Sequence, residues 1–213
     1  MTITVLGATG ATGRLVVQQL LSLGHPVLGA VRKPEKAAKS AVGGIEFVAF
    51  DLADPGRRFE EVFAATEIVV NAAATRTMTK KQADLIDRQG VIAAIDAAAS
   101  AGVKRWIQVS MMGSGDPARL PRYLRATGQA KDAADAHLAE SGMTWTVIRP
   151  PWLTDGAATG RITVGEQVPE GSLTRADLAA VAVASLDIAA THNRLFEVTG
   201  GGRPVTESLM TLG

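Results

Sequence analysis

Short apolar segments rich in β-branched residues alternate with longer Ala- and Leu-rich segments along the 213-residue chain. This alternation restricts the fold most, because strands joined by helical connections pair in parallel and are covered by helices on both faces. Right-handed crossovers then predict an α/β domain with a doubly wound parallel sheet. The expected strands are Thr2–Leu6, Pro26–Val31, Ile45–Phe50, Glu67–Asn71, Arg105–Ser110, Thr144–Arg149 and Leu195–Thr199.

The segments between these strands are predicted to be helices, and several end at a glycine that suits a helix C-cap, as at Gly24 and Gly102. No repeat or long linker interrupts the pattern, so we expect one domain over residues 1–213 with a small C-terminal extension. The least regular stretches, Met111–Ala126 and Pro150–Thr174, follow strand ends, where ligands bind in open α/β sheets. The expected helices are Ala11–Gly24, Pro34–Ala41, Arg57–Ala64, Thr79–Gly102, Thr127–Gly142 and Arg175–Ala190.

Composition narrows the possible partners and chemistry. A formal net charge of +1 is too small to attract nucleic acid or an anionic membrane strongly. No apolar run reaches the roughly 18 residues of a membrane span and no signal-peptide pattern opens the chain, so we expect a cytoplasmic protein. The lack of Cys excludes disulfides and thiolate chemistry, and the 3 His are scattered, so no metal site is predicted.

Three glycines, Gly7, Gly10 and Gly13, directly follow the first expected strand and open the first expected helix. There, one glycine allows a tight turn, one lets the backbone approach a pyrophosphate, and one lets helix and strand pack closely. Free N–H groups at a helix start also attract an anion. A structural turn without a ligand is the alternative. The candidate phosphate-binding residues are Gly7, Thr9, Gly10, Ala11, Thr12 and Gly13.

The end of the second expected strand indicates which nucleotide would bind. Folds that select NAD usually carry Asp or Glu about 20 residues after the glycines, where it binds the ribose 2′-OH. At that place this chain has Arg32, and Lys36 follows about one helical turn further on. A guanidinium suits a 2′-phosphate, so the sequence favours NADP(H). The alternative is that both residues belong to a solvated helix start.

Two further strand ends fit a dinucleotide. Asp51 could accept a hydrogen bond from the adenine amino group with Leu52 beside the ring, although an Asp here could equally cap a turn. Ala72, Ala73 and Ala74 follow the fourth strand with small side chains that would let the backbone lie against a ribose. Ordinary tight packing is the alternative explanation for these alanines.

Motifs in chain order carry a family resemblance. They include Gly-Ala-Thr-Gly-x-x-Gly-Arg from Gly7, Ile86-Asp87-x-x-Gly90, Ala130-Lys131-x-x-Ala134-Asp135 and Thr146-Val147-Ile148-Arg149-Pro150. Through them the chain resembles the atypical short-chain dehydrogenase/reductases, in the NAD(P)H-binding, NmrA-like branch that includes biliverdin reductase B-type flavin reductases. The resemblance runs nearly end to end and implies a single Rossmann-like domain that binds NADP(H).

The resemblance also implies how the site is divided. Residues 1–110 would form the cofactor half, and residues 111–175 would supply most of the cleft for the acceptor. Ser110 and Lys131 would lie near the nicotinamide ribose, and the backbone at Pro150 would face the nicotinamide.

The catalytic residues depart from the wider family's pattern. Those enzymes often use Ser with a Tyr–Lys pair four residues apart on one helix face, where Lys lowers the Tyr pKa. Lys131 fits, but Thr127 occupies the Tyr position. The only tyrosine, Tyr123, stands eight residues before Lys131, or about 12 Å along a continuous helix. Tyr123 is therefore either a proton donor on a loop or an aromatic at the cleft mouth, and Ser110 either binds substrate or caps its strand.

Two functions stay open from the sequence. The first is an NADP(H)-dependent reductase that passes hydride to a small flat acceptor such as a flavin or quinone, with Trp152 and Met111 as candidate acceptor contacts. The second is a non-catalytic NADP(H) sensor. A sugar-nucleotide epimerase is disfavoured, because too few residues follow the sixth strand to build a substrate domain. The resemblance favours a monomer or weak homodimer.

Overall fold

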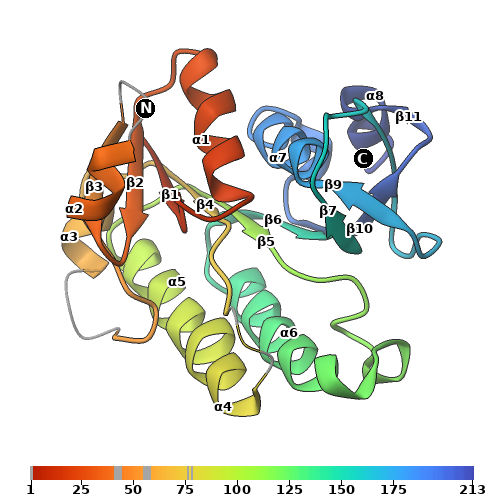
Figure 1. Cartoon of the computed structure of the whole chain (residues 1–213), viewed down its shortest axis with the longest axis horizontal. Helices are drawn as coiled ribbons and strands as arrows, with labels where there is room; N and C mark the ends of the chain where they lie inside the picture. The colour runs from red at the N-terminus through yellow and green to blue at the C-terminus, as the bar shows by residue number, and fades with distance from the viewer. Residues whose placement is uncertain (1, 41–44, 55–58, 76, 78) are drawn as a thin grey trace.

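The computed structural model describes residues 2–40, 45–54, 59–75, 77 and 79–213. Within these residues, a nine-stranded sheet forms the centre of the molecule and a two-stranded sheet lies beside it (Figure 1). The strands of the large sheet are β1 (Ile3–Leu6), β2 (Val27–Val31), β3 (Ile45–Ala49), β4 (Ile68–Asn71), β5 (Arg105–Val109), β6 (Thr144–Arg149), β8 (Arg161–Gly165), β10 (Arg194–Gly200) and β11 (Arg203–Pro204).

The large sheet has the strand order β11-β8-β10-β6-β5-β4-β1-β2-β3. From β3 to β10 every neighbouring pair is parallel, which confirms the predicted doubly wound arrangement. The seven expected strands are all present, and each begins and ends within one residue of its predicted bounds. The edge departs from the prediction, because β8 pairs antiparallel with β10 and β11 pairs antiparallel with β8.

Residues 150–174 were predicted to be irregular, and this was wrong. The segment contains β8 and the two strands of the small parallel sheet, β7 (Trp152–Thr154) and β9 (Ser172–Thr174). Two of these three strands have only three residues, too few to show an alternating pattern in the sequence.

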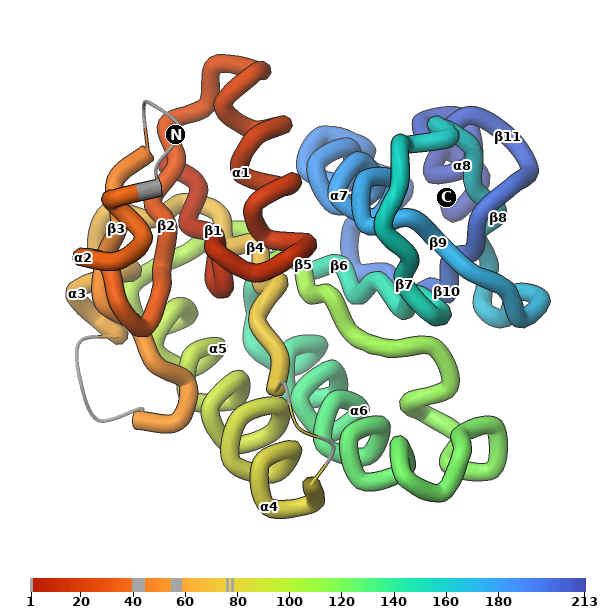
Figure 2. Tube along the Cα trace, in the orientation of Figure 1, coloured from red at the N-terminus to blue at the C-terminus, as the bar shows by residue number. Residues whose placement is uncertain are grey.

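Helices cover both faces of the large sheet. Figures 1 and 2 show α1 and α7 side by side on one face, with α5 and α6 on the other. The helices are α1 (Gly13–Ser22), α2 (Pro34–Ala37), α3 (Phe59–Phe63), α4 (Lys80–Gln82), the π-helical η2 (Ala83–Gly90), α5 (Val91–Ser100), α6 (Arg125–Ala139), α7 (Arg175–Ala184) and α8 (Val205–Met210), with 3₁₀ turns η1 (Ala38–Ser40), η3 (Pro117–Arg119), η4 (Arg122–Leu124) and η5 (Ala189–Thr191).

The predicted helices exist, with changed bounds. The segment expected as one helix over Thr79–Gly102 is divided into α4, η2 and α5. The helix expected at Thr127 begins at Arg125, and the one expected to end at Ala190 ends at Ala184. Ala41 and Arg57, which bound two other expected helices, lie outside the described residues.

Glycine ends α1 as the sequence predicted. Gly24 has φ +79°, its N–H donates to the carbonyl of Leu21, and the N–H of His25 donates to the carbonyl of Leu20. These two bonds form a Schellman cap, which satisfies carbonyls left free at the helix end. The next strand, β2, begins three residues after Gly24.

Each face of the sheet buries its own apolar core. On one face α1, α7 and α8 pack on the strands, with Leu20, Val181 and Leu209 fully buried. On the other face α3, α5 and α6 pack on the strands around Phe63 and Trp106. Because N-terminal α1 packs on C-terminal α7, the two halves of the chain share one of these cores. Within the described residues, none of the helices has the length and apolar character needed to cross a membrane.

Candidate functional site

The glycine turn between β1 and α1 is held by close backbone contacts. Gly7 has φ +75°, and a Cβ there would lie 2.8 Å from the Cα of Ala73. A Cβ at Gly13 would overlap the carbonyl oxygen of Gly7. At Gly10, in contrast, the only atom of the described residues that a Cβ would meet is that oxygen, at 3.1 Å. Gly7 and Gly13 are therefore needed for packing, whereas Gly10 leaves the outer side of the turn free for a close ligand.

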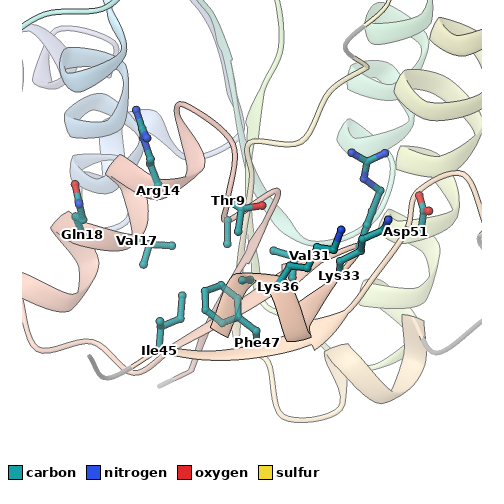
Figure 3. Close-up of a pocket in the computed structure, with 13 residues that line it drawn as sticks. Thr9, Arg14, Val17, Gln18, Val31, Lys33, Lys36, Ile45, Phe47 and Asp51 are labelled. Carbon is teal, nitrogen blue, oxygen red and sulfur yellow. The ribbon is translucent and has the colours of Figure 1, made fainter. Parts of the chain in front are cut away.

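A cavity of about 810 Å³ opens beside this turn (Figure 3). It lies between α1, the end of β2 and the start of α2, and four basic side chains line it with one carboxylate. Figure 3 shows Arg14 projecting from α1 on one side, with Lys33, Lys36 and Asp51 on the other. The full lining is Ala8, Thr9, Arg14, Val17, Gln18, Val31, Arg32, Lys33, Lys36, Ala37, Ile45, Phe47 and Asp51.

The cavity also has an apolar floor. Val17, Ile45 and Phe47 line it below the cations (Figure 3). The Phe47 ring lies over Gly29, where a Cβ would come within 2.7 Å of the ring. An apolar wall beside clustered cations suits a ligand with a flat base and a phosphate.

The sequence-predicted adenine-side residues are partly brought together. Thr9, Arg32, Lys36 and Asp51 all line the cavity. Asp51 also accepts a hydrogen bond from the N–H of Ala53 at 3.0 Å, so it caps a turn as well. The structure places Leu52 elsewhere than predicted.

The Leu52 side chain is 6% exposed and packs in the core on the α5 face, so it does not lie beside the cavity. Its carbonyl oxygen instead lies against Gly90, where any Cβ would overlap it. Among the turn residues, Ala11 is exposed and Thr12 is buried with no side-chain cap bond.

Two charged lining residues were missed from the sequence. Arg14 directly follows Gly13, and Lys33 directly follows Arg32. Both could have been predicted from the sequence, because charged residues next to a phosphate-binding turn and next to a strand end lie at the same edge of the sheet.

The alanines that follow β4 lie against the glycine turn. The N–H of Ala72 donates to the carbonyl of Leu6, and the N–H of Ala73 donates to the side chain of Asn71 at 3.0 Å. Ala73 is the residue that a Cβ at Gly7 would strike, and Ala74 is exposed. These small residues therefore allow two strand ends to approach closely, as the packing alternative predicted.

Beyond β4, charged side chains are buried at the ends of β5 and β6. Lys131 on α6 is 6% exposed, and its Nζ lies 3.3 Å from Oδ1 of Asp87. The same oxygen accepts a hydrogen bond from the N–H of Thr75 at 3.3 Å. Asp87 therefore connects Lys131 to the loop after β4, a role that the sequence did not reveal.

Asp87 reaches this position from a π-helix. The segment η2, Ala83–Gly90, packs against α6. Wide π turns are rare and occur often at functional sites. The sequence predicted an uninterrupted helix here, and the structure corrects this.

Ser110 follows β5 and is tied to α6 as well. Its hydroxyl donates to Oδ2 of Asp135 at 2.7 Å. Asp135 stands one helical turn after Lys131. The structure thus brings Ser110 and Lys131 to one cluster through Asp87 and Asp135, two carboxylates that the sequence-based site did not include.

The remaining candidates lie around this cluster. Tyr123 is in η4, is 54% exposed and has no described contact with Ser110 or Lys131. Thr127 is 7% exposed, and within the described residues its hydroxyl has no hydrogen-bond partner. Trp152 on β7 is 59% exposed, so its ring is free to contact a ligand.

The loop after β5 returns close to β6. The carbonyl of Pro150 accepts from the N–H of Met112 at 2.9 Å, and the terminal methyl of the half-buried Met111 lies near Gly128.

Within the described chain, no group of three His, Asp or Glu side chains is arranged to hold a metal ion.

A buried carboxylate connects the loop after β5 and the loop after β8. Glu197 on β10 is 3% exposed and accepts from Arg119 at 2.6 and 2.9 Å. It also accepts from the N–H groups of Gly113 and Val168. Burial acts to raise the pKa of Glu197, but the hydrogen bonds from Arg119 and these two N–H groups outweigh it and hold the pKa below its ordinary value.

A parallel sheet with a glycine turn after its first strand, and with a cation-lined cavity beside that turn, defines a dinucleotide-binding protein. The model of the NAD(P)H-binding family matches residues 7–189, and the chain belongs to this family, within the NmrA-like atypical short-chain dehydrogenase/reductases.

Similar proteins agree with this assignment. A Bacillus subtilis protein named as an uncharacterized sugar epimerase, YhfK, is 34% identical over 221 residues and covers 100% of both chains. A solved structure from Bacillus halodurans, provisionally described as an NAD-dependent epimerase/dehydratase, aligns over 99% of each chain with TM-score 0.91 and 32% identity. ChuY, an anaerobilin reductase from Escherichia coli O157:H7, aligns over 94% of this chain and 97% of its own, with TM-score 0.79 and 26% identity.

Proposed function

We propose that the protein is an NADP(H)-dependent reductase that passes hydride to a small flat acceptor such as a flavin or quinone. The single observation that carries the cofactor choice is the charge of the cavity. Arg14, Arg32, Lys33 and Lys36 line it against one carboxylate, Asp51. Four cations at the adenosine end suit the 2′-phosphate that distinguishes NADP(H) from NAD(H).

The protein's contribution is binding and orientation. NADPH supplies the hydride when bound. The turn at Gly10 leaves space for the pyrophosphate. The ion-paired Lys131 and the Thr127 hydroxyl, which has no hydrogen-bond partner among the described residues, are the polar groups that we propose for the ribose. These residues fit a dinucleotide laid across the carboxyl ends of the strands.

Two side chains on the proposed acceptor side favour a reductase over an epimerase. Trp152 offers an exposed ring on which a flat molecule can stack, and Met111 offers an adaptable wall. No Tyr precedes Lys131 by four residues, and a flavin-type acceptor needs no phenol when another group or solvent gives the proton. Among the similar proteins, ChuY is named as a reductase and YhfK is named as an epimerase.

We propose a small molecule as the partner of a monomeric or weakly dimeric chain.

A direct assay separates this function from its rivals. Purified protein is mixed with NADPH and with FMN, riboflavin or a simple quinone, and the loss of NADPH absorbance is followed. We expect turnover with at least one acceptor. Tight NADPH binding without turnover on any of them would instead favour the non-catalytic sensor, which the missing Tyr at Thr127 also allows.

The cofactor choice has its own test. Arg32→Ala and Arg14→Ala each remove a lining cation. Losing a charged hydrogen bond costs about 1.5–3 kcal/mol, so we expect roughly tenfold or greater weakening of NADPH binding and little change for NADH. Lys39→Ala is the matched control, because Lys39 is exposed on neighbouring η1 and does not line the cavity. Equal losses for both nucleotides would argue against a 2′-phosphate site.

A further inference from the structure

The carboxyl group of Asp135 has an unusual set of contacts. Ser110 Oγ donates to its Oδ2 at 2.7 Å, and Arg149 donates to the same oxygen from Nε at 3.1 Å and Nη2 at 2.8 Å. The other oxygen, Oδ1, is buried and has no hydrogen-bond partner among the described residues. The residue as a whole is 2% exposed. The three donors all contact Oδ2, so none of the described residues stabilises a negative charge on Oδ1.

The charges facing Asp135 come from three elements. Arg149 reaches it from β6, and Lys131 and Asp132 stand beside it on α6. Asp132 accepts from Nη2 of Arg149 at 2.7 Å, and Asp87 on η2 pairs with Lys131. The cluster therefore holds two cations and three carboxyl groups, and Asp132 is the only one of these carboxyl groups that is half exposed.

Within this cluster, burial shifts the pKa of Asp135. It raises the pKa of Asp135 to about 6, although Arg149, Ser110 and Lys131 all act in the opposite direction. Asp132 is 47% exposed at its side chain, so it stays solvated and marks where the cluster meets water. Asp135 is thus a buried acid whose protonation changes near neutral pH.

Ser110 connects this acid to the expected reaction site. It follows β5, between the ends of β4 and β6, at the edge where the carboxyl ends of the parallel strands meet. Ligands of such sheets bind at this edge. The phenol that many relatives of this fold use is absent, since Thr127 stands four residues before Lys131.

We propose that Asp135 stores a proton and returns it to Ser110, which makes the Ser110 hydroxyl the proton donor to the reduced acceptor. This role rests on the proposed reductase function. The Ser110 O–H bond breaks as its proton goes to the anionic atom of the flavin- or quinone-type acceptor. In the protonated state Oδ2 of Asp135 carries the proton and donates to Ser110 Oγ, which leaves the Ser110 hydroxyl hydrogen free for the acceptor. The Oδ2–H bond of Asp135 breaks as its proton passes to Ser110 Oγ, and water on the Asp132 side restores the proton to Asp135.

The first test needs no turnover and no variant that endangers folding. The side-chain carboxyl of Asp135 is assigned by carbon-13 NMR in the wild-type protein and titrated. We expect its midpoint near pH 6, and a shift to higher pH in Ser110→Ala, because the serine hydroxyl stabilises the carboxylate. A midpoint below about pH 4, the ordinary range for Asp, would overturn the proposal.

The second test uses the pH dependence of turnover with saturating NADPH and acceptor. In the wild type, we expect kcat to fall as the pH rises through about 6. Asp135→Asn keeps an oxygen for Arg149 but stores no proton, so we expect kcat about 100-fold lower, with that pH dependence lost and NADPH affinity kept. Asp96→Asn is the control, since Asp96 is an exposed carboxylate on α5.

The outcomes separate the two proposals. Turnover by Asp135→Asn with the wild-type pH profile would overturn the role of Asp135 and leave the reductase function standing. No turnover by the wild type with any acceptor would overturn the reductase function and the donor role together, whatever the carboxyl titration shows. If Asp135→Asn fails to fold, Ser110→Ala replaces it. An unchanged kcat in Ser110→Ala contradicts the donor role.

Discussion

A methyl group added at Gly13 would overlap the carbonyl oxygen of Gly7. One added at Gly10 would meet that oxygen at 3.1 Å and no other atom of the described residues within 4 Å. We therefore expect Gly13→Ala to lower the free energy of unfolding by about 1–3 kcal/mol or more. Gly10→Ala should fold with a smaller loss but bind NADPH at least tenfold more weakly, because its methyl enters the space proposed for the pyrophosphate. Urea unfolding and NADPH titration measure the two effects.

Gly24→Ala is a useful control for this pair, since a Cβ there would meet nothing within 4 Å and only the positive φ resists it. Its NADPH affinity should match the wild type. If Gly10→Ala bound NADPH normally, the turn would be a structural feature only, as the alternative explanation of the sequence states.

How far the sequence predicts single residues depends on whether their partners are local. Arg32 and Lys36 were found because a strand end fixes where they lie, and both line the cavity. Asp135 and Asp87 were missed as site residues, because their partners come from distant parts of the chain. Ser110 and Asp135, for example, are 25 residues apart, and only the packing of α6 on the sheet brings them together.

At the scale of elements, Glu197 holds two loops to β10 through Arg119, Gly113 and Val168. Glu197→Gln leaves Arg119 without its bidentate partner. Because Arg119 is partly exposed, we expect a loss of about 1–3 kcal/mol in unfolding free energy. We also expect a raised KM for the acceptor, since the loops lie on the proposed acceptor side, with unchanged NADPH affinity.

Glu166→Gln provides the matched control, because Glu166 is exposed on the same loop as Val168. Steady-state kinetics at varied acceptor concentration, with urea unfolding, make the comparison. A loss of NADPH affinity as large as the rise in KM would show that the loops are coupled to the cofactor half instead.

The errors in predicting elements have physical causes. The helix expected over Thr79–Gly102 was interrupted by the π turn of η2, which places Asp87 against Lys131. Strands β7 and β9 were missed because three residues cannot display a period of two. In both cases tertiary contacts, rather than local propensity, set the conformation.

For the whole molecule, the parallel part of the sheet was predictable because each strand–helix–strand unit has only one favoured handedness. The antiparallel edge was not, because β8 pairs with β10 across a connection that contains α7. Such a pairing depends on the C-terminal segment folding back. Arg203–Pro204 extends the edge, and Ser208 of α8 donates to the carbonyl of Ile162 on β8.

Three buried carboxyls shape how the stability of the whole molecule depends on pH. Folding raises the pKa of Asp135 to about 6, mainly through burial. For Asp177, burial also acts to raise the pKa, but hydrogen bonds from Thr159, Gly160 and Thr174 hold it below its ordinary value of 3.8. The pKa of Glu197 is likewise held below 4.5. The raised pKa of Asp135 and the lowered pKa values of Asp177 and Glu197 therefore change the free energy of unfolding with pH in opposite directions.

A carboxyl with a raised pKa binds more protons in the native than in the unfolded state, so its contribution to stability falls as the pH rises from 3.8 to about 6. The lowered pKa values of Asp177 and Glu197 give contributions to stability that are present above pH 3.8 and pH 4.5, respectively, and are lost as the pH falls below these values.

Urea unfolding between about pH 3.5 and 7 measures these effects. The free energy of unfolding of the wild type should fall relative to that of Asp135→Asn as the pH rises from 4 to 6, by up to about 3 kcal/mol. In Glu197→Gln, the free energy of unfolding should instead fall less than in the wild type as the pH drops below about 4.5, because the variant has no carboxyl to protonate at this position. A constant difference between wild type and Asp135→Asn across this range would mean that the pKa of Asp135 is the same in the folded and unfolded states, because only a carboxyl that titrates differently in the two states gives a pH-dependent difference.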